Sequence, residues 1–259
     1  MTSEKSQLEP TIRASLLGPV EITVQGRVLP VLDWPRRAAR SLLFMLLGSP
    51  GHRIARDFAL ETLWPDQQLD AAANSLYKSI HLLRRTLEPD LQTGRGSSFV
   101  VLTPDLIGLN PEIQISVDAD IFERGLLTRS NSPEARRNTL RSSIALYRGD
   151  FLADEPYAEW AYVERERLRD VAGRLLGTLG EIALAAGEEI RALGYYKRLA
   201  DMHPFDTAVQ RKVMAIHLRI GRRSDAMRRY DELRVRMLRE FGAGPEFQLS
   251  DLVDDAAAG

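Results

Sequence analysis

The chain has 259 residues, of which 44% are hydrophobic and 27% are charged. At about 100–200 residues per domain, this length predicts two domains, and the ordinary apolar fraction excludes wholesale disorder. The formal net charge is −1, from 35 basic and 36 acidic residues, so any nucleic-acid site must be a local patch. There is no cysteine, which excludes disulfides, thiolate metal sites and cysteine nucleophiles.

Residues 1–11 are polar and lack the apolar centre of a signal peptide, so they are expected to form a flexible tail. No segment approaches the roughly 18 consecutive apolar residues that a membrane-spanning helix needs. The 4 histidines are scattered along the chain, so a histidine-rich metal cage is not expected. We therefore expect a cytoplasmic protein with no membrane association, no metal and no cofactor.

The first 110 residues predict a small mixed unit. Short antiparallel strands are expected within residues 12–32, which are rich in valine, isoleucine and leucine and carry turn residues. Three helices follow, over residues 35–48, 56–63 and 70–87. A hairpin is expected over residues 99–109, with its turn at Thr103-Pro104-Asp105. Strands, three helices and a terminal hairpin, in that order, indicate a winged helix-turn-helix.

From about residue 117 a helical period dominates the sequence. Helices are expected over residues 120–129, 134–147, 158–186, 188–201, 207–220 and 224–241. Equivalent residues recur 34 positions apart, as in Ala192/Ala226, Tyr196/Tyr230 and Leu199/Leu233, which is the period of tetratricopeptide helix pairs. With the domain junction expected at residues 110–116, the sequence predicts a mainly helical α+β fold. It consists of a winged-helix domain over residues 12–113 and an all-α tetratricopeptide-like domain over residues 114–259.

Several short motifs occur in a specific order along the chain. They are Leu16-Leu17-Gly18-Pro19-Val20-Glu21, Leu60-xx-Leu63-Trp64-Pro65-Asp66, Asn74-Ser75-Leu76, Leu83-Arg84-Arg85-xx-Leu87, Leu146-Tyr147-Arg148-Gly149-Asp150-Phe151-Leu152 and His203-Pro204. In this order they resemble the SARP/AfsR-type bacterial transcriptional activators, over about residues 12–253. The resemblance implies an OmpR-type winged-helix DNA-binding domain joined to a bacterial transcriptional activator domain.

The resemblance also implies partners. Members of the family bind double-stranded promoter DNA, often at short direct repeats, assemble on tandem sites and recruit RNA polymerase, so the chain is expected to be a DNA-binding activator. No catalytic constellation stands out in the sequence, and an enzyme is not expected.

The segment 70–87 is the candidate recognition helix, because its leucine and isoleucine residues fall on one face and leave the opposite face to the major groove. The candidate DNA-binding residues on this helix are Asn74, Ser75, Lys78, Ser79, His81, Leu82 and Arg85. We expect Lys78 and Asn74 to read bases, since lysine recognises guanine and asparagine recognises adenine. Ser75 and Arg85 are expected to hold phosphates.

Other basic positions carry two interpretations. Arg95, Ser97 and Ser98 are placed in the wing, where they are expected to reach the minor groove or an adjacent phosphate, with a mobile surface loop as the equal alternative. Arg36, Arg37 and Arg40 could meet phosphate or form a solvated face. Arg84 lies nearer the buried stripe, where an internal carboxylate such as Asp57 or Glu61 could pair with it.

A second function is also compatible with the sequence. The family usually has arginine where this chain has Leu82, and residues 1–113 carry no net charge. Charged residues opposite an apolar stripe are typical of any solvated helix. The alternative is therefore a tetratricopeptide-like interaction scaffold whose degenerate winged helix does not bind DNA autonomously.

Overall fold

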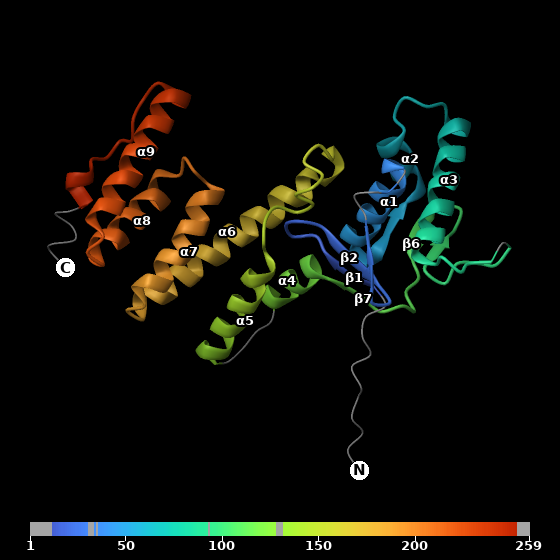
Figure 1. Cartoon of the computed structure of the whole chain (residues 1–259), viewed down its shortest axis with the longest axis horizontal. Coiled ribbons are helices and arrows are strands. Elements are labelled where there is room, and N and C mark those ends of the chain that lie inside the picture. Colours follow the sequence, from blue (N-terminus) through green and yellow to red (C-terminus); the bar gives the residue numbers. More distant parts are fainter. Residues whose placement is uncertain (1–11, 31–33, 35, 93, 128–131, 253–259) are drawn as a thin grey trace, which may run out of the picture. The chain divides into compact units, whose positions relative to one another are not determined.

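The computed structural model describes residues 12–30, 34, 36–92, 94–127 and 132–252 (Figure 1). The expected tail, residues 1–11, lies outside them. The chain forms two compact units, which are described separately. The N-terminal unit comprises Met1–Leu127 with Ala145–Arg165, and the C-terminal unit comprises Thr128–Ile144 with Glu166–Gly259.

A four-stranded sheet with the order β3-β2-β1-β7 opens the N-terminal unit. Its strands are β1 (Ile12–Ser15), β2 (Glu21–Val24), β3 (Arg27–Leu29) and β7 (Ile115–Val117). β1 pairs antiparallel with β2 and parallel with β7. The side chains alternate along β1 and β2, so that Ile12, Ala14, Ile22 and Val24 are buried while their neighbours are not.

Three helices and a second sheet complete the winged helix (Figure 1). The helices are α1 (Arg37–Gly48), α2 (Arg56–Leu63) and α3 (Leu69–Leu87), and a short 3-10 turn, η2, covers Pro50–His52. The second sheet has the order β4-β6-β5, from β4 (Arg53–Ala55), β5 (Val100–Leu102) and β6 (Leu106–Leu109). α1 packs against both α2 and α3. The expected winged helix-turn-helix is present, with helix ends within two residues of those expected.

The N-terminal unit continues past the expected junction at residues 110–116. Residues 115–117 form β7, and α4 (Asp118–Leu127) follows in the same unit. Leu17 forms a β-bridge with Phe151, and the Cα of Gly18 lies close to Gly149. The sequence-based division at residue 113 therefore differs from the division into compact units, because residues 114–127 and 145–165 pack on β1 and its neighbours.

The remaining helices are α5 (Pro133–Leu146), η3 (Glu159–Ala161), α6 (Tyr162–Ala185), α7 (Glu189–Met202), α8 (Thr207–Arg219) and α9 (Arg223–Phe241). They lie close to the positions expected from the sequence, except that residues 159–161 form a 3-10 turn before α6. The 34-residue repeat found in the sequence corresponds to buried positions in successive helices. Ala192 and Ala226 are fully buried, and Tyr196, Leu199 and Leu233 pack between neighbouring helices.

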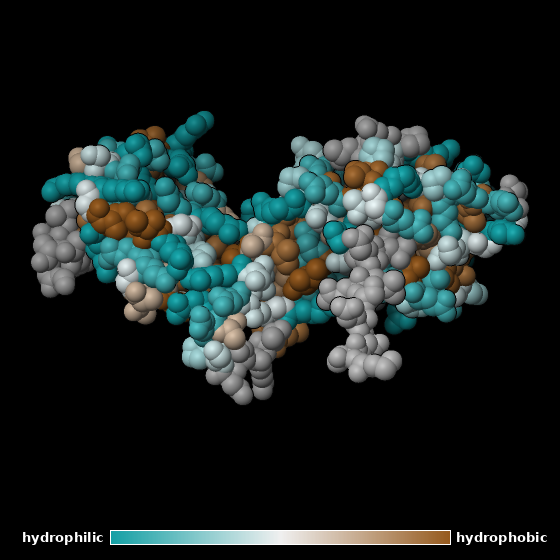
Figure 2. Space-filling view, turned by 60° about the horizontal axis from the view of Figure 1, so that its bottom comes forward, coloured by the Kyte–Doolittle hydropathy of each residue, from teal (hydrophilic) through white to brown (hydrophobic). Residues whose placement is uncertain are grey.

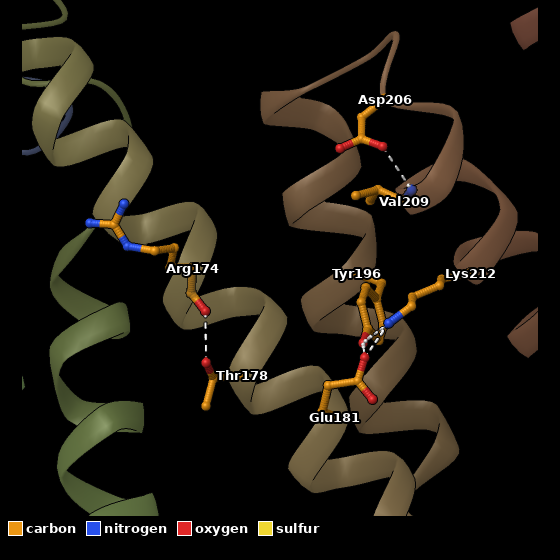
Figure 3. Close-up of polar contacts among 7 residues, drawn as sticks. All are labelled: Arg174, Thr178, Glu181, Tyr196, Asp206, Val209 and Lys212. Atoms are coloured by element: carbon orange, nitrogen blue, oxygen red, sulfur yellow. Dashed lines mark hydrogen bonds and ion pairs between the residues drawn. The ribbon is translucent and has the colours of Figure 1, made fainter.

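Polar contacts join α6, α7 and α8 in the C-terminal unit (Figure 3). The Tyr196 hydroxyl on α7 donates a hydrogen bond to Glu181 on α6 at 2.6 Å, and Lys212 on α8 binds both residues. Asp206 caps α8 by accepting a hydrogen bond from the amide of Val209 at 3.1 Å. These contacts hold the three helices in register.

The end of the helical stack is covered by the segment after α9. Phe247 and Leu252 are buried in a cluster with Met214, Ala226 and Leu233. The face seen in Figure 2 is mainly hydrophilic, with separate hydrophobic patches. None of the described helices is long and apolar enough to cross a bilayer.

Candidate nucleic-acid interface

The helix α3 is amphipathic, and its two faces have different environments. Leu76, Ile80, Leu83 and Leu87 are each at most 2% exposed and pack in the core of the N-terminal unit. This burial fixes the rotation of the helix about its axis. The opposite face is therefore presented to solvent, as a recognition helix requires.

Four of the expected contact residues share the exposed face of α3. They are Asn74, Lys78, His81 and Arg85. Their spacing of i, i+4, i+7 and i+11 places them on one line along the helix. The side chain of Leu82 lies at the edge of this face and is partly buried. It contributes an apolar surface where a charged side chain would contact phosphate.

The two serines at the edge of α3 are engaged within the protein. Ser79 is 1% exposed, and its hydroxyl donates to the carbonyl oxygen of Ser75 at 2.9 Å. The expectation that Ser79 contacts DNA was wrong, because it is three residues after Leu76 and thus on the buried face. Ser75 is partly exposed, and its hydroxyl donates to Oε1 of Gln67 at 3.1 Å.

An aromatic residue on the same exposed face was missed by the sequence analysis. Tyr77 is 49% exposed and lies three residues after Asn74 and four before His81. The guanidinium of Arg56, at the start of α2, lies over its ring at 5.6 Å from the centroid. The helical spacing could have revealed Tyr77, but only the fold brings Arg56 to it.

The loop after α3 differs from the expected wing. The hairpin turn is formed by Thr103, Pro104 and Asp105, whereas Arg95 and Ser98 lie earlier, in the loop between α3 and β5. Arg95 is exposed. The carbonyl oxygen of Asp105 accepts a hydrogen bond from the amide of Arg56 at 2.8 Å, so the turn lies against the start of α2.

Glu88 organises the loop that follows α3. Its carboxylate accepts hydrogen bonds from the hydroxyls of Ser97 and Ser98, and from the Ser98 amide at 3.0 Å. Partial burial alone raises the pKa of the Glu88 carboxyl, but these hydrogen bonds outweigh it and hold the pKa below its ordinary value. The Ser98 hydroxyl is thus occupied within the loop.

The basic start of α1 is tied to the segment that precedes α6. Arg40 forms an ion pair with Glu155, whose side chain is 5% exposed, and Arg37 lies 3.4 Å from the same carboxylate. These contacts disfavour the interpretation of Arg40 as a phosphate ligand. Arg84 donates to the carbonyl oxygen of Val100 at 3.2 Å, which is a backbone group and not the expected carboxylate.

A further carboxylate links β1 to α4. Asp118 is buried, and it accepts hydrogen bonds from the amides of Leu16 and Leu17 at 2.7 and 3.1 Å. Burial raises the pKa of the Asp118 carboxyl, and these hydrogen bonds oppose the shift. In the part of the chain that the structure describes, no three histidine, aspartate or glutamate side chains gather as metal ligands.

The model of the bacterial transcriptional activator domain family matches residues 117–255. The chain belongs to this family. Regulatory protein AfsR of Streptomyces coelicolor is 25% identical over 243 residues, which are 93% of this chain and 24% of AfsR. Transcriptional regulatory protein MoaR1 of Mycobacterium tuberculosis is 26% identical over 239 residues, which are 90% of this chain and 75% of MoaR1. The chain thus spans about a quarter of AfsR, and the resemblance to SARP/AfsR-type regulators is confirmed.

A solved structure gives the same fold. Mycobacterium tuberculosis EmbR, in complex with a low affinity phosphopeptide, superposes with a TM-score of 0.66 at 19% identity. The match covers 96% of this chain and 66% of EmbR. The family is named for transcriptional activators, and both curated relatives are named as regulatory proteins.

Proposed function

We propose that this chain regulates transcription by binding double-stranded promoter DNA through the exposed face of α3. The observation that carries the proposal is the arrangement of Asn74, Tyr77, Lys78, His81 and Arg85 on one face whose opposite side is buried. A helix of this kind enters the major groove with its exposed side chains against base edges. Residues 12–113 would then supply the DNA-binding domain.

Within this interface the side chains have different roles. Lys78 and Asn74 read base edges, because both can donate to acceptors in the major groove and Asn also pairs with adenine. Arg85 and Arg95 contact the backbone, where contacts set register without reading sequence. Ser75 and Ser98 are left with supporting roles, since the hydroxyl of Ser75 donates to Gln67 and that of Ser98 donates to Glu88.

Tyr77 and Arg56 extend this interface toward the start of α2. The stacked guanidinium keeps donors available at the edge of the recognition helix, and the phenol adds a hydroxyl beside them. Together they are suited to grip a phosphate on the strand that flanks the groove. This pair compensates in part for Leu82, which adds no charge.

The partners of the assembled regulator follow from the family likeness. Activators of this type recruit RNA polymerase, and we propose RNA polymerase as the protein partner of this chain. Copies are proposed to assemble on tandem sites. The phosphopeptide belongs to the EmbR complex, and no phosphopeptide is assigned to this chain.

The alternative is an interaction scaffold whose winged helix does not bind DNA. Two observations favour it, the apolar Leu82 at the edge of the recognition face and the acidic Asp105 in the hairpin turn. A salt series on duplex DNA separates the two functions, since log K falls with log[salt] at a slope of about −0.9 per phosphate contact. Affinity for DNA that does not change with salt concentration, or no binding to DNA at low salt, would favour the interaction scaffold.

Mapping of the genomic fragments that bind the purified full chain supplies the specific site. We expect a short repeated sequence to be enriched, because each copy presents one recognition helix and members of the family act at repeats. Recovery of random fragments at low salt would show electrostatic binding without sequence recognition.

A further inference from the structure

The helix α9 carries a second exposed stripe, at the C-terminal end of the helical stack. Ala226 and Leu233 are buried in the cluster formed with Met214, Phe247 and Leu252. On the outer side, Met227, Asp231, Arg234 and Leu238 follow one another at i, i+4, i+7 and i+11. This spacing places the four side chains in one straight row on the surface.

The row is exposed and has apolar ends. Met227 is 50% exposed and Leu238 is 59% exposed. The side chains of Asp231 and Arg234 are 64% and 59% exposed, with 3.7 Å between a carboxylate oxygen of one and a guanidinium nitrogen of the other. Beside Leu238, Phe241 is exposed and stacks edge-to-face with Phe205, with ring centroids 4.9 Å apart. These exposed apolar residues interrupt the polar outer face that is expected of the last helix in a capped repeat array.

We propose that this row binds the same row of a second copy of the chain, with the two α9 helices antiparallel. Along the row the residues are apolar, acidic, basic and apolar. A second row that runs in the opposite direction therefore places basic opposite acidic and apolar opposite apolar. Met227 then lies opposite Leu238 of the second copy, and Asp231 opposite Arg234. A two-fold axis repeats each contact, as in an isologous interface.

The charges select both the partner and its direction. In a parallel pair, Asp231 would face Asp231 and Arg234 would face Arg234, and like charges in contact are unfavourable. In the antiparallel pair, the ion pair within each helix joins that of the second copy in a cluster of alternating charge. This pattern favours a second copy over a partner of single-sign charge.

The contact is small, so the association is expected to be weak in free solution. From position 227 to position 238 the row spans about 16 Å, at 1.5 Å per residue. This inference deepens the self-association that rests on the proposed function. It is tested without DNA, so that its failure leaves DNA binding untouched.

Disulfide trapping tests the direction of pairing, and the cysteine-free chain gives it a clean background. The variants Met227→Cys and Leu238→Cys of the full chain are oxidised separately and as an equimolar mixture. We expect the mixture to form a covalent dimer and each variant alone to form little, because equivalent positions lie about 16 Å apart along the axis. The proposal would be overturned if no sample formed a covalent dimer, or if all three formed it equally. It would also be overturned if the sample containing only Met227→Cys formed as much dimer as the mixture.

Charge reversal tests the central contacts by sedimentation velocity over a concentration series. Asp231→Arg and Arg234→Asp are each expected to raise the dissociation constant of the dimer about tenfold, because two exposed pairs change from attraction to repulsion. The double variant restores association, and so does an equimolar mixture of the two single variants. Arg236→Asp, which reverses a charge on another exposed face of α9, is the matched control. A monomeric wild-type chain at every concentration, or a double variant as weak as the single ones, would contradict the antiparallel contact.

Discussion

The carboxylate of Asp118 accepts a hydrogen bond from the backbone amide of Leu16, which lies 102 positions earlier in the chain, at 2.7 Å. The same carboxylate binds the amides of Leu17 and Ala119. It therefore joins the end of β1 to the start of α4, and the winged helix is completed by residues that follow it in sequence.

Replacing Asp118 by alanine leaves the amides of Leu16 and Leu17 buried without their acceptor. Because an unsatisfied buried donor carries its full desolvation penalty, we expect the free energy of unfolding to fall by about 2–3 kcal/mol. Urea unfolding of the full chain, followed by circular dichroism, measures the change. Glu112→Ala removes an exposed carboxylate nearby and is expected to change stability by less than about 0.5 kcal/mol. Equal effects of the two substitutions would refute the anchoring role.

The packing of α6 on α7 depends on a glycine. A Cβ on Gly180 would lie 2.6 Å from Cε2 of Tyr196, a fully buried side chain, whereas a Cβ on Gly177 would lie 3.9 Å from Leu199. Gly180→Ala is expected to destabilise the protein by about 1–3 kcal/mol, since the buried ring must move. Gly177→Ala is expected to be neutral or slightly stabilising, because alanine favours a helix interior over glycine. Thermal unfolding of both variants measures the two effects. A Gly177→Ala variant less stable than Gly180→Ala would show that the packing around Gly180 does not constrain the Tyr196 ring.

The stability of the C-terminal unit depends on a buried histidine. His217 is 3% exposed, and its Nδ1 lies 3.9 Å from an oxygen of Asp225. Burial lowers the pKa of the imidazole below its ordinary value of 6.5, while the Asp225 carboxylate opposes the shift. The folded state therefore binds this proton less readily than the unfolded state.

The sign of the pH dependence follows from the lowered pKa. The contribution of neutral His217 is fully present above the unfolded pKa and is lost as the pH falls below it toward the folded pKa. We expect stability to decline as the pH falls below the ordinary histidine pKa of 6.5, and His217→Gln to reduce this decline. His81→Gln, an exposed histidine, is the control and should leave it unchanged. An identical pH dependence in wild type and His217→Gln would show that the unfolding of the chain is not linked to this group.

Tyr77 tests the contribution of the stacked pair beside the recognition helix. Tyr77→Ala removes both the ring under Arg56 and the hydroxyl, and we expect DNA affinity to fall by about 1 kcal/mol or more. Tyr77→Phe keeps the ring and removes only the hydroxyl, so a smaller loss is expected. Anisotropy titrations on one duplex compare the two variants. Affinities equal to that of the wild type in both would remove Tyr77 and its stacking partner from the interface.

The sequence predicts the elements of this fold better than their contacts. The ends of α3 are predictable because its apolar residues recur with the helical period and Glu88-Pro89 interrupts it. β7 is not, since it has three residues and pairs with a strand about a hundred positions away. The burial of Ser79 could have been deduced from its spacing to Leu76 and Leu83, but a small polar residue at that position resembles a surface one.

The contacts of charged residues are the least predictable part. Arg40 belongs to a basic cluster in sequence, and only the fold shows that Glu155 neutralises it. Arg56 likewise reaches Tyr77 through the packing of α2 on α3. A residue's charge is thus known from the sequence, whereas its availability to DNA depends on partners far along the chain.

The most direct measurement of the central claim is the affinity of Lys78→Ala for the DNA site recovered from genomic mapping, compared with that of Lys197→Ala. Both variants lose one exposed lysine, but Lys78 lies on the exposed face of α3 and Lys197 lies on α7 in the C-terminal unit. If Lys78 reads a base, its variant should bind about 1–3 kcal/mol more weakly, and Lys197→Ala should bind as the wild type does. Equal affinities of the two variants and the wild type would contradict DNA recognition by this face of α3.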